Sequence, residues 1–96
     1  MQNIDNKELC PVCGYNVFEN LGVYPWHDNI SSLEICSSCG IQFGYEDAAG
    51  GDLVKREEIY NDWRKRWIEG GMKWWGDKKN KPKDWDSKKQ LDNLLS

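Results

Sequence analysis

Long apolar stretches are absent from this 96-residue sequence, and their absence limits the classes of protein to which it can belong. No run approaches the roughly 20 consecutive apolar residues that a membrane-spanning helix needs. The first ten residues, MQNIDNKELC, lack the basic and apolar regions of a secretory signal. We therefore expect a cytoplasmic protein without a membrane span. The mean hydropathy is −0.84 and 30% of the residues are charged, so few apolar side chains remain to build a core.

The patterns of common catalytic sites are also missing. The sequence shows no nucleophile arranged with a base, no glycine-rich phosphate loop and no H-E-x-x-H pattern. The single histidine, His27, lies in the turn-like stretch YPWHDN. Glu46 and Asp47 are paired carboxylates, but adjacent side chains on a strand point in opposite directions and make a poor acid and base pair. We therefore expect a protein that is not an enzyme.

Basic residues are almost missing from the first half of the chain. Residues 1–52 contain one cation, Lys7, against eight carboxylates, which gives this segment a net charge of −7. Residues 53–71 carry +1, and residues 72–96, with seven lysines and four aspartates, carry +3. An acidic segment repels the phosphates of nucleic acid. The charge distribution therefore argues against nucleic acid as a partner and leaves only the lysines from Lys73 to Lys89 for such binding.

Four cysteines stand out against this background, in two C-x-x-C pairs. The first pair lies in CPVCGY and the second in CSSCG, so the candidate ligands are Cys10, Cys13, Cys36 and Cys39. In a reducing compartment such pairs are typical of a metal site, whereas in an exported protein they would allow three disulfide pairings. Gly14 and Gly40 follow the second cysteine of each pair, and we expect them to take positive φ so that nearby N–H groups can face the sulfurs.

Zinc is the metal that this ligand set favours. Four thiolates fill the tetrahedral shell of Zn²⁺ and leave no position for a water molecule, which indicates a structural metal rather than a catalytic one. Iron held by four thiolates has the same geometry, so the spacing alone leaves zinc and iron as alternatives.

The residues around the cysteines predict short strands. YNVF, LEIC and IQFGY are typical of strands of three to five residues, and ENLG and PWHDN are typical of turns. We therefore expect residues 9–47 to form a zinc ribbon of short antiparallel β hairpins.

The second half predicts a helix and a tail. Asp52 can cap a helix over residues 53–69 that ends at Gly70 and Gly71. Residues 72–96 are rich in lysine but carry three tryptophans, so we expect a tail that docks on the domain. A short helix should begin at Ser87, which has capping-box spacing to Gln90. Together these expectations describe a single small α+β domain over residues 1–96.

Six tryptophans in so short a chain invite a binding hypothesis. Trp63 and Trp67 lie one turn apart on the apolar face of the predicted helix, so we expect them to pack it onto the ribbon. Trp74 and Trp75 are adjacent and cannot both face inward easily, so one of them is a candidate for a protein-protein contact. The acidic ribbon supplies two further candidates for partner binding, Glu46 and Asp47.

The two cysteine blocks resemble a known family. CPVCGY followed by EICSSCGIQFGYEDA is similar to the bacterial cysteine-rich CPCC family of small zinc-ribbon-like proteins, whose pattern runs roughly CPCCGY, then EICPxC, then an aromatic and acidic residues. The matching residues are Cys10, Pro11, Cys13, Gly14 and Tyr15 in the first block, Glu34, Ile35, Cys36 and Cys39 in the second, and Glu46 and Asp47 at the acidic end. Val12 stands where the family has an extra cysteine, and Ser37 replaces the second proline. The resemblance covers residues 9–47 and implies zinc and a ribbon-like fold, but little about activity.

The first block, C-x-x-C-G-Y, is also similar to rubredoxins, where a second C-P-x-C-G completes an iron site for one-electron transfer. The leading interpretation is thus a non-catalytic zinc-binding module that interacts with another protein. A rubredoxin-like electron carrier and a nucleic-acid-binding zinc ribbon are the alternatives.

Overall fold

The computed structural model describes residues 6–95, so residues 1–5 and Ser96, which belong to the single expected domain, lie outside it. Within this range one antiparallel pair of strands accompanies three α-helices, and short 3₁₀ helices occur at Asn6–Glu8 (η1), Ala49–Gly51 (η2) and Lys78–Asn80 (η3). The α-helices are α1 (Val17–Leu21), α2 (Leu53–Glu69) and α3 (Ser87–Leu95), and the strands are β1 (Trp26–His27) and β2 (Ile30–Ser31). The expected small α+β fold is confirmed at this level.

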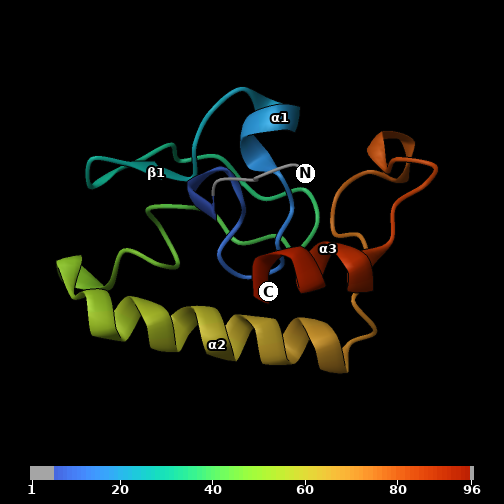
Figure 1. Ribbon diagram of the computed structural model, residues 1–96. Coiled ribbons are helices and arrows are strands. Elements are labelled where there is room, and N and C mark those ends of the chain that lie inside the picture. Colours follow the sequence, from blue (N-terminus) through green and yellow to red (C-terminus); the bar gives the residue numbers. More distant parts are fainter. Residues whose placement is uncertain (1–5, 96) are drawn as a thin grey trace.

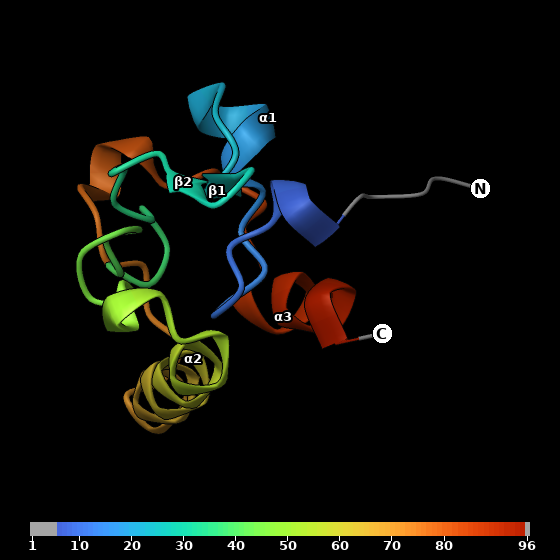
Figure 2. The same ribbon diagram turned by 90° about the vertical axis from the view of Figure 1, so that its left-hand side faces the viewer.

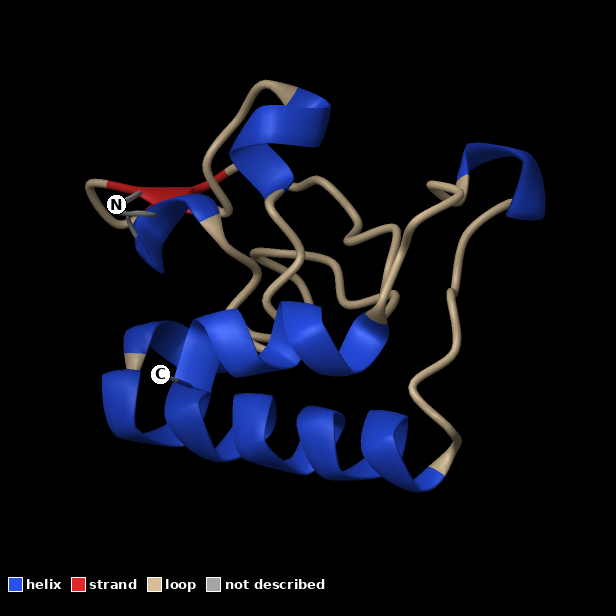
Figure 3. Cartoon of the chain, turned by 45° about the vertical axis from the view of Figure 1, so that its right-hand side comes forward, coloured by secondary structure: helices blue, strands red, loops and turns tan. Residues whose placement is uncertain are grey.

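The elements surround the loops that carry the cysteines. Helix α2 runs along one side of the molecule, and α1 and the β hairpin lie on the opposite side (Figures 1 and 2). The loops lie between these two sides (Figure 3). None of the helices in residues 6–95 is both long and apolar enough to cross a membrane.

The predicted strand YNVF is wrong, because Val17 and Phe18 begin helix α1. The Asn16 side chain accepts a hydrogen bond of 2.8 Å from the Glu19 N–H and caps the helix. Gly22, with φ of 76°, ends it by donating its N–H to the Phe18 carbonyl. These two local caps outweigh the β preference of Val17 and Phe18.

Strand pairing is much shorter than predicted. LEIC and IQFGY contribute one bridge, between Ile35 and Gln42, and the first cysteine block is closed by a single bridge between Leu9 and Asn16. The two-residue strands β1 and β2 instead flank Asp28 and Asn29, within the predicted turn PWHDN. These two residues have φ of 50° and 66°, the positive values of a type I′ hairpin turn.

Helix α2 has the predicted bounds. The Asp52 carboxylate accepts hydrogen bonds from the N–H groups of Val54 and Lys55, at 3.0 and 3.1 Å. Trp67 is buried and Trp63 is partly buried against the core, which confirms that these indoles pack the helix onto the cysteine loops.

The tail lies against the second cysteine loop. The N–H of Trp75 donates to the Ser38 carbonyl at 3.0 Å, and the N–H of Gly76 donates to the Ser37 carbonyl at 2.9 Å. The final helix begins at Ser87 as predicted, but its cap is Asp86, whose carboxylate accepts from the Lys89 N–H at 3.1 Å.

Candidate metal centre

The two cysteine pairs lie in turns with the same hydrogen bonds. In the first turn, residues 10–15, the Cys10 N–H donates to the Tyr15 carbonyl at 2.8 Å and the Gly14 N–H donates to the Cys10 carbonyl at 2.9 Å. The second turn, residues 36–41, has equivalent bonds of 2.8 Å, from Cys36 to Ile41 and from Gly40 to Cys36. Both glycines have φ of 84°, as the sequence predicted. Repeated C-x-x-C-G therefore produces a repeated structure.

The turns bring the four predicted ligands together. All four sulfur atoms lie within 4.8 Å of one another, and the cysteines are free of disulfides. The Sγ atoms of Cys10 and Cys39 are 3.8 Å apart, and those of Cys13 and Cys36 are 3.6 Å apart. Sulfurs about 2.3 Å from a central zinc would be about 3.8 Å apart in a regular tetrahedron. These two distances match a tetrahedral site, and the four clustered thiols could hold a metal ion.

The thiols are also closed off from solvent. Cys10, Cys13 and Cys36 have no exposed surface, and Cys39 is 5% exposed. Cys39 borders a cavity of about 210 Å³ that Trp63, Arg66 and Trp67 also line. The site can therefore hold an ion by its own sulfurs, with contact to solvent restricted to the Cys39 side.

The surroundings shift the pKa values of the thiols in different directions. Burial is the main cause that raises the pKa of Cys10 and of Cys39. Burial also raises the pKa of Cys13, but hydrogen bonds from the other three cysteines and from Ser38 outweigh it, so the net pKa of Cys13 is lowered. In addition, the Val12 N–H donates to Cys10 Sγ at 3.4 Å. The other thiols and Ser38 thus favour the thiolate of Cys13, whereas burial disfavours the thiolates of Cys10 and Cys39.

Helix α2 fixes both turns through side chains. Arg64 donates from Nε to the Val12 carbonyl at 2.7 Å and from Nη2 to the Pro11 carbonyl at 2.6 Å. Trp63 donates from Nε1 to the Cys39 carbonyl at 3.0 Å. No sequence pattern indicates that Arg64 binds the first cysteine turn. From the sequence alone it would be interpreted as a cation near the negative end of the helix dipole.

Helix α3 also links the two cysteine turns. Gln90 Nε2 donates to the Cys13 carbonyl at 3.1 Å and to Ser38 Oγ at 3.0 Å, so one amide group joins the two turns. Its Oε1 accepts from Trp85 Nε1 at 2.8 Å. The sequence spacing predicts Gln90 in a capping box with Ser87, whereas the structure gives it this different role.

Of the two acidic candidates for partner binding, Asp47 lies in the interior. Its side chain has no exposed surface, and its Oδ2 accepts from Trp26 Nε1 at 2.9 Å and from the Tyr60 hydroxyl at 2.7 Å. Its Oδ1 accepts from the Gly44 N–H at 2.5 Å. Glu46 is partly buried and accepts from the Gln42 N–H at 2.6 Å. Asp47 has no surface to offer a partner and organises the core instead.

Arg56 and Tyr60 link helix α2 to this carboxylate. Arg56 Nε donates to the Asp47 carbonyl at 2.8 Å, and its guanidinium carbon lies 3.9 Å from the centre of the Trp26 ring. Burial, together with the hydrogen bond and the negative charge of Asp47, holds the pKa of Tyr60 far above its usual range. Arg56 is a charged residue on the otherwise apolar face of the helix. Its guanidinium hydrogen-bonds to the backbone carbonyls of Asp47 and Ala48, which explains its place there.

The two adjacent tryptophans have different environments. Trp74 is partly buried, with its ring edge-on to Tyr15 and to Trp85 at centroid distances of 5.6 and 5.3 Å. Trp75 is 59% exposed, and its indole lies so close to Gly40 that a Cβ there would clash with it. As expected, one of the pair faces inward and the other faces solvent.

Comparison of the chain with protein-family models, with curated proteins and with solved structures finds no match.

Proposed function

We propose that this protein is a non-catalytic zinc-binding protein, in which a structural metal joins the two cysteine turns and the folded surface binds another protein. The proposal depends chiefly on the cluster of four buried sulfurs, which together would fill the shell of a tetrahedral ion. The resemblance of residues 9–47 to the bacterial CPCC family supports zinc.

Metal analysis tests the first half of this proposal. Protein isolated from iron-replete cells under reducing conditions should contain one zinc per chain and be colourless. A stoichiometric amount of iron with the visible absorption of a ferric thiolate site would overturn it in favour of a rubredoxin-like carrier, because iron fits the same four sulfurs. A Cys36→Ser variant is the control, since it should lose the metal whichever ion is present.

The proposed partner surface is centred on Trp75. An exposed tryptophan on a rigid support is a common energetic centre of protein-protein contacts. The indole of Trp75 packs against Gly40, which directly follows the proposed ligand Cys39. The metal would thus stiffen the surface that the partner contacts. Glu46, which is partly exposed, is a second candidate for contact with the partner, whereas Asp47 is buried and is not.

Capture of partners from native cytosol tests the second half. A specific partner of the wild-type protein should be lost with Trp75→Ala, reduced with Glu46→Gln and kept with Val54→Ala. Val54 is a suitable control because it is 72% exposed and lies on helix α2. Metal content shows whether the Trp75 variant is folded. If folded Trp75→Ala and Glu46→Gln retain every partner, the interaction surface is wrong while the metal site stands.

A further inference from the structure

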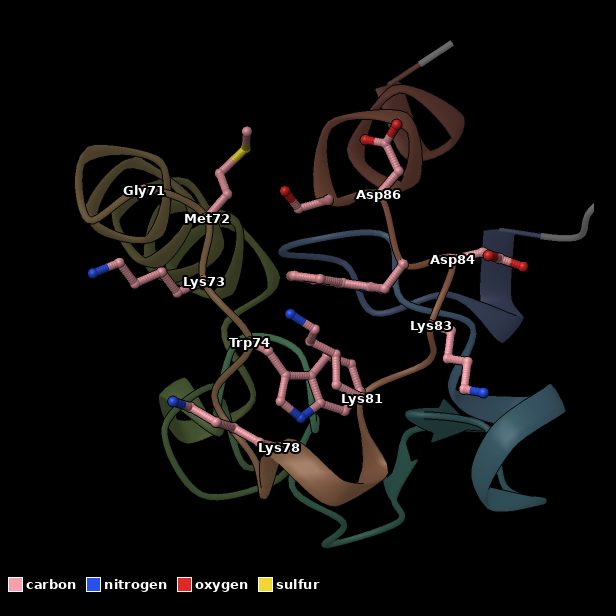
Figure 4. A pocket seen from close by; sticks show the side chains of 11 residues that line it. Gly71, Met72, Lys73, Trp74, Lys78, Lys81, Lys83, Asp84 and Asp86 are labelled. Carbon is pink, nitrogen blue, oxygen red and sulfur yellow. The ribbon is translucent and has the colours of Figure 1, made fainter.

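The tail borders an open cavity that the metal centre and the partner surface do not use. Its walls come from residues 71–74, where the tail begins, and from Lys81 and residues 83–87 further along it, with Lys78 at the rim (Figure 4). Its volume is about 760 Å³. Sites for small molecules commonly enclose about 300 to 1,000 Å³. The cavity is therefore large enough for an organic ligand rather than a single ion.

The walls of the cavity are basic although the whole chain is acidic. Four lysines line it against two aspartates, a difference of two positive charges: Lys73, Lys78, Lys81 and Lys83 against Asp84 and Asp86. Figure 4 shows the Lys81 side chain directed into the cavity toward Trp74, whereas Lys73, Lys78 and Lys83 extend from the rim. A ligand with a negative group would meet Lys81 inside and a positive field at the entrance.

Two indoles supply aromatic walls. Trp74 and Trp85 line the cavity with their rings nearly perpendicular, at 78°. Their Nε1–H groups are already used, since Trp74 donates to the Asp77 carbonyl at 3.0 Å and Trp85 donates to Gln90 at 2.8 Å. The rings therefore have only π surface to offer a ligand, in the part that their edge-on contact leaves uncovered, and the Lys81 ammonium lies over the Trp85 ring, 6.0 Å from its centre. An aromatic surface for stacking and a positive charge therefore lie next to each other in this cavity.

The aromatic wall is held in place by the core. Gln90, which fixes the Trp85 indole, also donates to the Cys13 carbonyl. Trp74 in turn packs edge-on against Tyr15, at the end of the first cysteine turn. The folded cysteine turns therefore position the cavity, and a ligand can bind there without touching the sulfurs.

We propose that this cavity binds a nucleoside phosphate, with the base stacked on the tryptophan wall and the phosphate beside Lys81. A planar ring joined to an anion is the chemistry that combines both features, because base stacking on aromatic side chains tolerates any base and a lysine ammonium is a common point-charge contact for phosphate. A free nucleotide and the terminal nucleotide of a single strand share this chemistry. The proposal does not depend on the protein partner, and it commits to the free nucleotide.

The test is titration of the metal-loaded protein with AMP at low salt, followed by calorimetry and by amide and indole NMR signals. AMP should bind, and it should shift the indole signals of Trp74 and Trp85 more than that of Trp63. Adenosine and inorganic phosphate should each bind at least about tenfold more weakly, because each lacks one of the two contacts. Equal binding of inorganic phosphate and AMP, or binding of an oligonucleotide without binding of AMP, would refute the proposal.

A matched pair of lysine variants locates the site. Lys81→Gln should weaken AMP binding about tenfold, since it removes a charged contact to phosphate. Lys65→Gln removes the same charge from an exposed position on helix α2, outside the cavity, and should change the affinity less than about twofold. Both side chains are exposed, so both variants should keep the NMR spectrum of the folded protein. Equal losses in the two variants would show non-specific attraction and overturn the assignment.

Discussion

Gly14 shows how one residue of the cysteine turn serves both the turn and the tail. Its φ of 84° lies in the left-handed region, where a side chain is strained. A Cβ at this position would also clash with the backbone carbonyl of Gln90 in helix α3. The glycine therefore lets the turn close and lets the last helix approach it. The sequence pattern predicted the first of these two roles, because the second depends on a residue far along the chain.

A second glycine separates the free-energy cost of backbone strain from that of the clash with helix α3. Gly22 has a similar φ of 76°, but nothing lies within 4 Å of where its Cβ would be. Gly22→Ala should therefore cost only the strain of the left-handed backbone, about 1 to 2 kcal/mol. Gly14→Ala should cost about 1 to 3 kcal/mol more, because helix α3 must also shift. Urea unfolding of the metal-loaded variants measures both free energies, and equal losses would show that α3 is not packed on Gly14.

At the scale of elements, helix α2 is a frame for the metal centre as well as a packing partner. Arg64 reaches from its C-terminal half to two carbonyls of the first cysteine turn, at 2.7 and 2.6 Å. Bonds from a charged guanidinium to backbone oxygens hold the turn in the shape that presents its two sulfurs. Arg64 therefore acts on the candidate metal site from outside the set of four thiols.

Arg64→Ala should lower both stability and metal affinity. We expect a loss of about 2 kcal/mol in the free energy of unfolding, since bonds from a charged donor are removed. We also expect a loss of about tenfold or more in metal affinity, as for other groups that orient ligands. Competition with a chromophoric chelator measures the affinity. Lys65→Ala, an exposed neighbour on the same helix, should change neither quantity appreciably. An affinity for metal that is the same in both variants would contradict this role.

The sequence predicted some elements and not others for a physical reason. Helix α2 was predictable because its start is set by a local cap at Asp52 and its end by adjacent glycines. Helix α1 was missed because caps at its two ends, Asn16 and Gly22, outweigh the β preference of Val17 and Phe18. The clustering of the four cysteines was predictable because their spacing is itself the signal. The positions of Asp47, Arg64 and Gln90 were not, because their partners lie far away along the chain.

For the whole molecule, the cysteines are part of the core rather than an addition to it. Buried residues of α2 and α3 belong to the same apolar cluster as the four thiols, namely Tyr60, Trp67 and Leu91. The acidic first half and the basic tail therefore meet around one centre. In a domain of this size a hydrophobic core alone supplies little stability, and a metal is one of the usual supplements.

Removal of the metal should therefore unfold the tail and release α2, as well as unfolding the cysteine turns. Binding of zinc to four thiolates in small domains contributes about 10 to 16 kcal/mol, which is as large as the whole stability of about 5 to 15 kcal/mol of a typical domain. We expect a strong chelator at neutral pH under reducing conditions to collapse the amide dispersion of residues 9–47 and of residues 53–95 together. Added zinc should restore both sets of signals. Retention of dispersed signals in residues 53–95 after chelation would show that the helices have a core of their own, and would separate the two halves of the molecule that the structure joins.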